Sequence, residues 1–135
     1  PGLTRVEDFN KKDMNISVRM GTTAEIAARE LFPLANLLPF GDEGQAIQEL
    51  KNGKAHAFIS SAPLPAQLAA KDPDNIYLPV TGMITQEPIG MALSPKNADA
   101  LSVLNAWIQN GHKSGWLDER WRYWFEGLEW EKDLQ

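Results

Sequence analysis

The sequence contains no cysteine and only two histidines, His56 and His112, among its 135 residues. The lack of cysteine excludes a disulfide framework, a thiol nucleophile and a cysteine-ligated zinc site. Neither histidine lies in a motif such as HExxH, so the residue types needed for a metal centre or a Ser-His-Asp triad are scarce. We therefore expect no metal, no cofactor and no catalytic residue.

Excess positive charge and long apolar runs are also missing. The chain has 13 Lys+Arg against 18 Asp+Glu, a formal net charge of −5, which provides no basic surface for nucleic acid. Its apolar runs are far shorter than the ~18 residues of a membrane span. The first residues lack the basic and apolar regions of a signal peptide. We expect a mature product or an excised piece that opens at Pro1, with neither nucleic acid nor a bilayer as its main partner.

The remaining composition, 43% hydrophobic and 23% charged, is that of a folded globular chain. Alternating apolar residues predict strands, and capping patterns with apolar stripes predict helices. In the first half of the chain the two types alternate, which favours an α/β fold with a mainly parallel sheet. The expected strands cover residues 16–20, 37–40, 55–59, 76–80 and 88–93; the expected helices cover 23–32, the segment between Asp42 and Asn52, and 63–70.

The last third of the sequence is helical and rich in tryptophan. Asn97 is expected to cap a helix over residues 98–110, and Ser114 to cap another. Four of the five tryptophans lie at or after Trp116. So many large aromatic side chains need an extensive apolar surface to pack on.

Ligands of parallel α/β sheets bind beyond the carboxyl ends of the strands, where helix N-termini point. Thr22 and Thr23 place two hydroxyls and free backbone N–H groups at such a helix start, which suits an anion or a carboxylate. The alternative is that Thr22 only caps its own helix, a role we also expect for Glu25. Ser60 and Ser61 follow the third strand at the same edge.

Arg19 stands at the end of the first expected strand. Its guanidinium is either solvent-exposed or a bidentate clamp for an acidic ligand. His56 lies in an apolar run, and there we expect a packed, hydrogen-bonded histidine rather than a ligand or a base.

The segment Val18-Arg19-Met20-Gly21-Thr22-Thr23-Ala24-Glu25 resembles the "v-x-x-G-T-T-x-E" element of bacterial extracellular solute-binding proteins of the polar amino acid type. Three later segments resemble further elements of that family in the same order. They are residues 46–59 ("AIQELKNGKAHAFI"), 87–92 ("EPIGMA") and 104–125, and the resemblance extends from about Val6 to Phe125.

This resemblance implies a two-lobed protein that closes on a small polar solute and delivers it to the membrane permease of an ABC importer. The chain resembles the second lobe plus a C-terminal segment. Residues 1–13 would be a linker from a missing first lobe, 14–85 the second α/β lobe, and 86–135 a return strand and C-terminal helices that normally belong to the other lobe. A periplasmic or extracellular location is implied, and Thr22 and Thr23 match the carboxylate donors of the family's second lobe.

The sequence departs from the family pattern at one important position. Ser61 stands where the family usually has an aspartate for the ligand's α-ammonium group, and His56 replaces another common aspartate. Without that carboxylate, an organic acid competes with an amino acid as the expected solute. The resulting candidate binding residues are Thr22, Thr23, Arg19 and Ser61.

Two other functions fit the same resemblance. One is the ligand-sensing domain of a membrane receptor. The other is an enzyme similar to cyclohexadienyl dehydratases, in which Glu25 would be a general acid with a raised pKa; we expect a non-enzymatic binder instead. Because the tryptophan-rich helices would lack the first lobe, we also expect a homodimer or a domain-exchanged assembly more often than a monomer.

Overall fold

The computed structural model describes residues 2–80, 82–87, 89–126 and 129–134. The chain divides into two compact units, Pro1–Gln86 and Glu87–Gln135, and each has its own architecture. No helix in the described ranges combines the length and the apolar character needed to cross a membrane.

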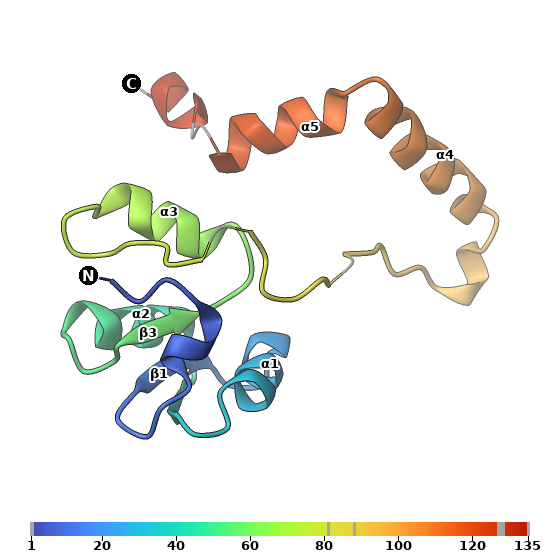
Figure 1. Ribbon diagram of the computed structural model, residues 1–135. Helices are drawn as coiled ribbons and strands as arrows, with labels where there is room; N and C mark the ends of the chain where they lie inside the picture. The colour runs from blue at the N-terminus through green and yellow to red at the C-terminus, as the bar shows by residue number, and fades with distance from the viewer. Residues whose placement is uncertain (1, 81, 88, 127–128, 135) are drawn as a thin grey trace. The chain divides into compact units, whose positions relative to one another are not determined.

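The first unit is built on a three-stranded parallel sheet (Figure 1). Strand β1 (Asn15–Arg19) lies in the centre, with β2 (Asn36–Phe40) on one side and β3 (Ala57–Ile59) on the other. All three strands run in the same direction, so their carboxyl ends meet at one edge. The predicted α/β class and the parallel sheet are confirmed.

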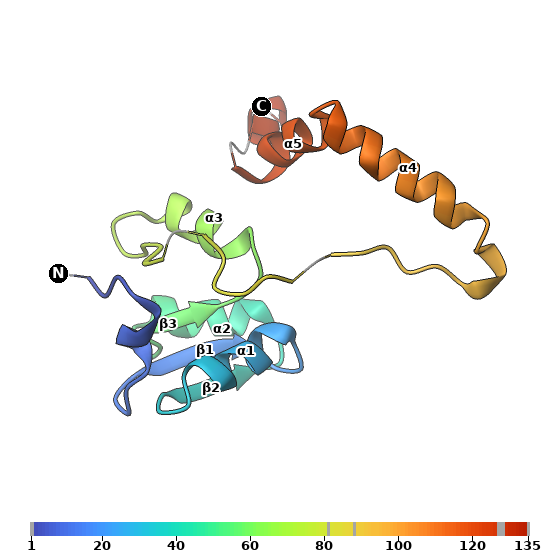
Figure 2. The same cartoon turned by 45° about the vertical axis from the view of Figure 1, so that its right-hand side comes forward.

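Helices cover both faces of this sheet. Helix α1 (Thr23–Leu31) lies in front of the sheet and α2 (Glu43–Lys51) behind it in both ribbon views (Figures 1 and 2). A third helix, α3 (Leu64–Lys71), follows β3. The side chains of Thr22 and Asp42 cap α1 and α2, as the capping patterns predict.

The central strand packs on these two helices by different means, because successive side chains of a strand point to opposite faces. Ser17, which is completely buried, donates its hydroxyl hydrogen to the carbonyl of Ala46 in α2 over 2.9 Å. The opposite face of β1 is apolar and meets α1. The buried apolar cluster there consists of Phe9, Ile16, Val18, Ala28 and Phe32.

The segment before the sheet takes part in this core. Residues 1–13 are expected to be a linker, yet they include a 3-10 helix, Val6–Phe9. Phe9 is only 7% exposed, and Leu3 and Val6 pack against the same cluster. Removing these apolar side chains from water lowers the free energy of the folded chain, and the segment therefore packs on the lobe instead of extending into solvent.

The second unit is helical. It contains α4 (Ala100–Lys113) and α5 (Trp116–Trp121), followed by a π-helix over Arg122–Glu126 and a 3-10 helix over Glu129–Leu134. Gly115, with φ of 74°, makes the turn between α4 and α5. Neither Asn97 nor Ser114 is the helix cap predicted from the sequence, because Asp99 precedes α4 and Gly115 precedes α5, both without a side-chain capping bond. Ser114 instead ends α4 and accepts the Trp116 N–H at 3.3 Å, and Ser94 caps a 3-10 turn, Pro95–Asn97, before α4. Its large exposed aromatics are Trp107, Trp116, Trp121, Trp124 and Phe125.

Three further local predictions are wrong. No strand forms over residues 76–80 or over the described part of 88–93, in which residue 88 lies outside the described ranges. A strand needs a partner for its backbone groups, and no strand in the described chain lies along either segment; Ile89 is 95% exposed. His56 is exposed and precedes β3 rather than lying inside it, although its Nδ1 accepts the Asn15 N–H as expected for a hydrogen-bonded histidine.

The packing of β1 predicts where the first unit is sensitive to truncation. Ile16→Ala should lower the free energy of unfolding by about 2–5 kcal/mol, because it removes a fully buried side chain and leaves a cavity. Ile26→Ala on α1 is the matched control, since Ile26 is 61% exposed and its loss should cost less than about 0.5 kcal/mol. Urea unfolding followed by circular dichroism measures both, and equal losses would contradict the assigned core.

Candidate functional site

The strand order reverses direction at β1, and this defines a point on the carboxyl edge of the sheet. The chain passes from β1 to β2 on one side and then crosses to β3 on the other. Parallel α/β sheets bind ligands outside the strand ends at such a reversal. Val18 pairs with Ile59, so the backbones of the residues that follow, Arg19 at the end of β1 and Ser60 just after β3, lie about one strand spacing (~4.8 Å) apart. The two loops that hold the predicted site residues are therefore neighbours.

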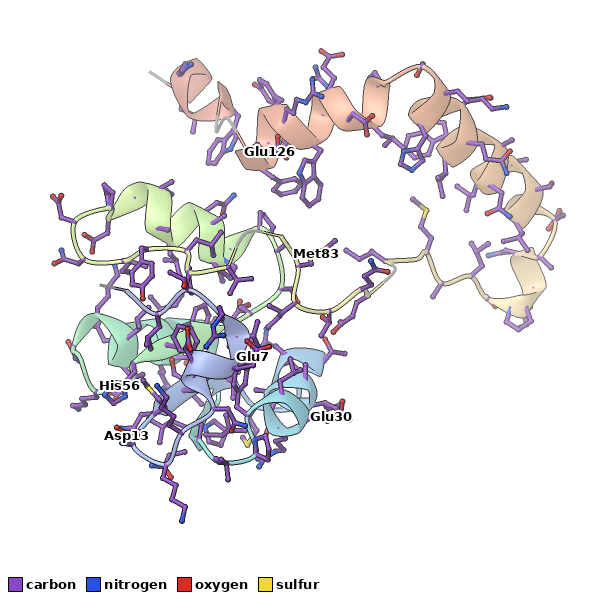
Figure 3. All side chains as sticks on the ribbon, in the orientation of Figure 1. Glu7, Asp13, Glu30, His56, Met83 and Glu126 are labelled. Atoms are coloured by element: carbon purple, nitrogen blue, oxygen red, sulfur yellow. The ribbon has the colours of Figure 1, made fainter. Side chains whose placement is uncertain are left out.

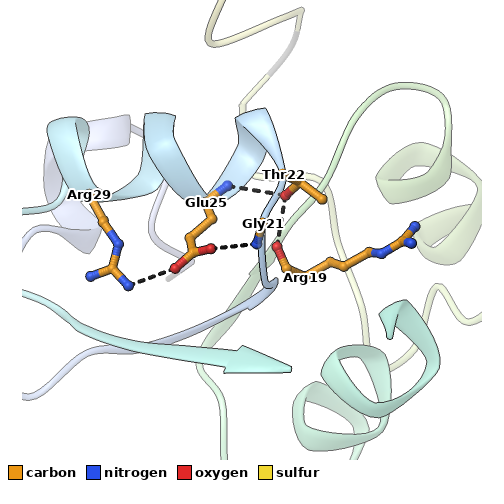
Figure 4. A network of polar contacts seen from close by, with 5 residues as sticks. All are labelled: Arg19, Gly21, Thr22, Glu25 and Arg29. Carbon is orange, nitrogen blue, oxygen red and sulfur yellow. Dashed lines mark hydrogen bonds and ion pairs between the residues drawn. The ribbon is translucent and has the colours of Figure 1, made fainter. Parts of the chain in front are cut away.

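Thr22 uses its hydroxyl group within the loop after β1. The oxygen accepts the Glu25 N–H at 3.3 Å, and the hydroxyl hydrogen is donated to the carbonyl of Arg19 at 2.8 Å (Figure 4). The capping role predicted for Thr22 is confirmed. Because its only hydroxyl hydrogen is engaged, Thr22 can offer a ligand its backbone N–H but not this hydrogen in the same geometry.

Thr23 is the first residue of α1 and is exposed. Its hydroxyl makes no hydrogen bond within the described chain. The N–H groups at the start of an α-helix have no intrahelical acceptor, and the helix dipole makes this end partly positive. Thr23 and the adjoining N–H groups can therefore donate hydrogen bonds to a carboxylate or another small anion.

Glu25 is held by two partners at this loop. Its Oε2 accepts the Gly21 N–H at 2.7 Å and its Oε1 accepts from Arg29 at 2.6 Å (Figure 4). The sequence predicts a bond back to Thr22; the carboxylate instead reaches one residue further. These contacts, first the Gly21 N–H and then Arg29, hold the pKa of Glu25 below its ordinary value of 4.5.

Arg19 ends β1 with its side chain exposed. Figure 4 shows this side chain pointing away from Glu25 and Arg29. Within the described residues it forms no ion pair. Its guanidinium is therefore available to a ligand at the carboxyl edge.

The loop after β3 contributes two serines of different character. Ser61 is exposed, and its carbonyl accepts the Leu64 N–H at 3.3 Å. Ser60 is half-buried and donates its hydroxyl to Oε1 of Glu43, the first residue of α2, over 2.5 Å. Glu43 is not among the site residues predicted from the sequence. Its position just after the second strand is the signal that could have placed it at this edge.

Other features of the first unit lie away from this edge. A cavity of about 120 Å³ is lined by His56, Phe58, Leu68 and Tyr77 among others, with no Asp, Glu, Lys or Arg in its wall. It lacks the charges that a polar solute requires. Figure 3 shows His56 on the same side of the unit as Asp13, which precedes β1. No group of three His, Asp or Glu residues suited to a metal ion occurs in the part of the chain that the structure describes.

Comparison with solved structures identifies the fold. A structure described as a binding component of an ABC transporter from Wolinella succinogenes, complexed with lysine, is 30% identical with a TM-score of 0.84 and covers 97% of this chain. The ancestral amino acid-binding protein AncCDT-1, a precursor of cyclohexadienyl dehydratase, is 31% identical with a TM-score of 0.71 over 92%. A mutant of ArgBP from T. maritima is 25% identical with a TM-score of 0.71 over 93%.

These matches establish the class of protein. The chain has the periplasmic-binding-protein fold, and the resemblance to solute-binding proteins of the amino acid type is confirmed. It spans about half the length of these structures, 51%, 56% and 53% respectively. No protein-family model and no curated protein matches the chain. An ancestral cyclohexadienyl dehydratase also matches at 23% identity, a likeness that shows the shared fold alone.

The lowered pKa of Glu25 predicts a pH-dependent contribution to stability. Because the folded-state pKa lies below 4.5, the ionised carboxylate stabilises the fold above pH 4.5, and this stabilisation is lost as the pH falls through the folded-state pKa. Glu25→Gln should therefore destabilise the protein at neutral pH, with the difference from the wild type vanishing in acid. Thermal unfolding between pH 2 and 7 measures this difference. A deficit that persists unchanged in acid would contradict it, and Glu30→Gln on the same helix is the control.

Proposed function

We propose that this chain binds a small polar solute with a carboxylate group at the carboxyl edge of its sheet, as the second lobe of a solute-binding protein. The observation that carries the proposal is the N-terminus of α1 at the strand-order reversal, where the Thr23 hydroxyl and the N–H groups of residues 22–24 make no hydrogen bond in the described chain. The approximately 30% identity to amino acid-binding proteins supports the same reading.

An amino acid or an organic acid suits the groups at this edge. Arg19 supplies a cation beside the N–H groups of α1, and Ser61 supplies a hydroxyl from the neighbouring loop. The lysine complex of the Wolinella succinogenes protein favours an amino acid. The four predicted residues, Arg19, Thr22, Thr23 and Ser61, make up half of a cleft that a first lobe would complete.

The proposed cellular role is solute capture for import. A binding protein of this class would sit in the periplasm or outside the cell and deliver its ligand to the membrane permease of an ABC importer. The matched ABC transporter component supports this role over that of a receptor's sensing domain. In this proposal the second lobe covers residues 14–85, and residues 86–135 form the C-terminal segment.

A dehydratase activity is not proposed. A general acid at neutral pH needs a raised pKa, whereas the Gly21 N–H and Arg29 lower the pKa of Glu25. The carboxylate is also occupied in capping α1. Most of the matched structures are described as binding proteins, which agrees with a non-enzymatic role.

The exposed aromatics of the second unit are proposed to mediate self-association of this chain. Trp107, Trp116 and Trp121 each leave more than 40% of their surface exposed, and aromatic patches of this kind are typical of interfaces. Light scattering of the isolated chain should show a dimer or larger assembly, and Trp107→Ser with Trp121→Ser should shift it toward monomer. A monomer at high concentration would contradict the proposal.

Ligand binding should depend on the start of α1. In the natural full-length form of the chain, Thr22→Ala with Thr23→Ala should weaken binding by at least about 1–2 kcal/mol, because it removes the Thr23 hydroxyl from a charged ligand and the Thr22 cap that positions the N–H groups of the loop. Thr23→Ala alone tests the ligand contact without removing the cap, and Thr22→Ser is the control that keeps the capping hydroxyl. Calorimetric titration with L-lysine and other amino acids measures these affinities, and unchanged values in the double variant would remove this loop from the site.

A further inference from the structure

We propose that Glu43 is the carboxylate that binds the ligand's α-ammonium group, an inference that rests on the proposed function. An ammonium group that leaves water needs an anionic partner to offset its lost hydration. Ser61, at the position where the resembled family usually has an aspartate, is uncharged. Glu43 provides a negative charge at the same edge of the sheet, from a different element.

The contact with Ser60 places this carboxylate. Glu43 opens α2 directly after β2, and its Oε1 accepts the Ser60 hydroxyl over 2.5 Å. Ser60 follows Ile59, which pairs with Val18, the residue before Arg19. The carboxylate is therefore anchored to the loop after β3, which neighbours the loop after β1.

One carboxylate oxygen of Glu43 is available for a hydrogen bond to a ligand. Its Oε2 makes no hydrogen bond, and the side chain forms no ion pair, in the part of the chain that is described. Two other carboxylates near this edge already have partners: Glu25 accepts from the Gly21 N–H and Arg29, and Asp42 accepts from the Gln45 N–H as the cap of α2. Of these three carboxylates, Glu43 is the one that contacts the loop after β3, and its Oε2 remains for an ammonium donor.

The spacing suits an α-amino acid. Its carboxylate and ammonium groups share one carbon, so the protein groups that bind them must come from adjacent segments. The loop after β1 carries the carboxylate donors, and the loop after β3, one strand spacing (~4.8 Å) away, carries Ser60 with Glu43 attached. Glu43 thus restores selectivity for amino acids that the Ser61 position lacks.

The test compares L-lysine with 6-aminohexanoate, which differs from lysine by the missing α-ammonium group. The natural full-length form of the wild type should bind lysine about tenfold or more tightly than 6-aminohexanoate, the factor expected for a hydrogen bond between charged groups. In Glu43→Gln this ratio should fall toward one. Glu49→Gln, the same substitution on the same helix at a residue whose Oε1 lies 3.4 Å from Lys54 Nζ, should leave the ratio unchanged.

The possible results distinguish the assignment of Glu43 from the proposed function. A ratio that survives in Glu43→Gln, with binding intact and the fold preserved by circular dichroism, overturns the assignment of Glu43 and leaves the proposed function standing. The substitution is repeated in an Arg19→Ala background; loss of its effect there would mean that Glu43 acts only by neutralising Arg19, which also overturns the assignment. A wild type that binds no amino acid and no carboxylic acid overturns both proposals.

Discussion

The alternation of side chains along β1 is the constraint on which the first unit depends. Ile16 and Val18 are completely buried on the face of α1, while Ser17 is completely buried on the face of α2. A hydroxyl in such a position must be hydrogen-bonded, and the carbonyl of Ala46 meets that need at 2.9 Å. The central strand thereby ties both helices to the sheet.

This arrangement also determines what reaches the carboxyl edge. With β1 in the centre and helices leaving on both faces, the loops after β1 and β3 stand side by side at the reversal of the strand order. Some polar groups there maintain the local structure, since Thr22 and Glu25 bond to their own loop and helix. The groups left over, on Arg19, Thr23, Ser61 and Glu43, are those that we propose bind the solute.

Much of this organisation could be predicted from local patterns. The capping boxes at Thr22 and Asp42 placed the starts of α1 and α2, and the strand periodicity placed β1 and β2 to within a residue or two. These features depend on hydrogen bonds and side-chain alternation between residues close in sequence. The predicted strand over 76–80 failed because a strand also requires a distant partner, which no local pattern supplies.

The candidate site shows the same division. The loop Arg19–Thr23 was predicted because its residues are contiguous, whereas the contact between Glu43 and Ser60 joins residues 17 positions apart and was missed. Phe9 also belongs to the core through contacts with residues distant in the sequence, although its segment was expected to be a linker.

The sequence by itself determined the α/β class, the helix caps and the resemblance to solute-binding proteins, because these follow from residue types at short, regular spacings. Only the tertiary structure decided which charges share the edge of the sheet. The order β2-β1-β3 brings together loops that are distant in the chain, and the hydrogen bonds within them decide which polar groups remain for a ligand.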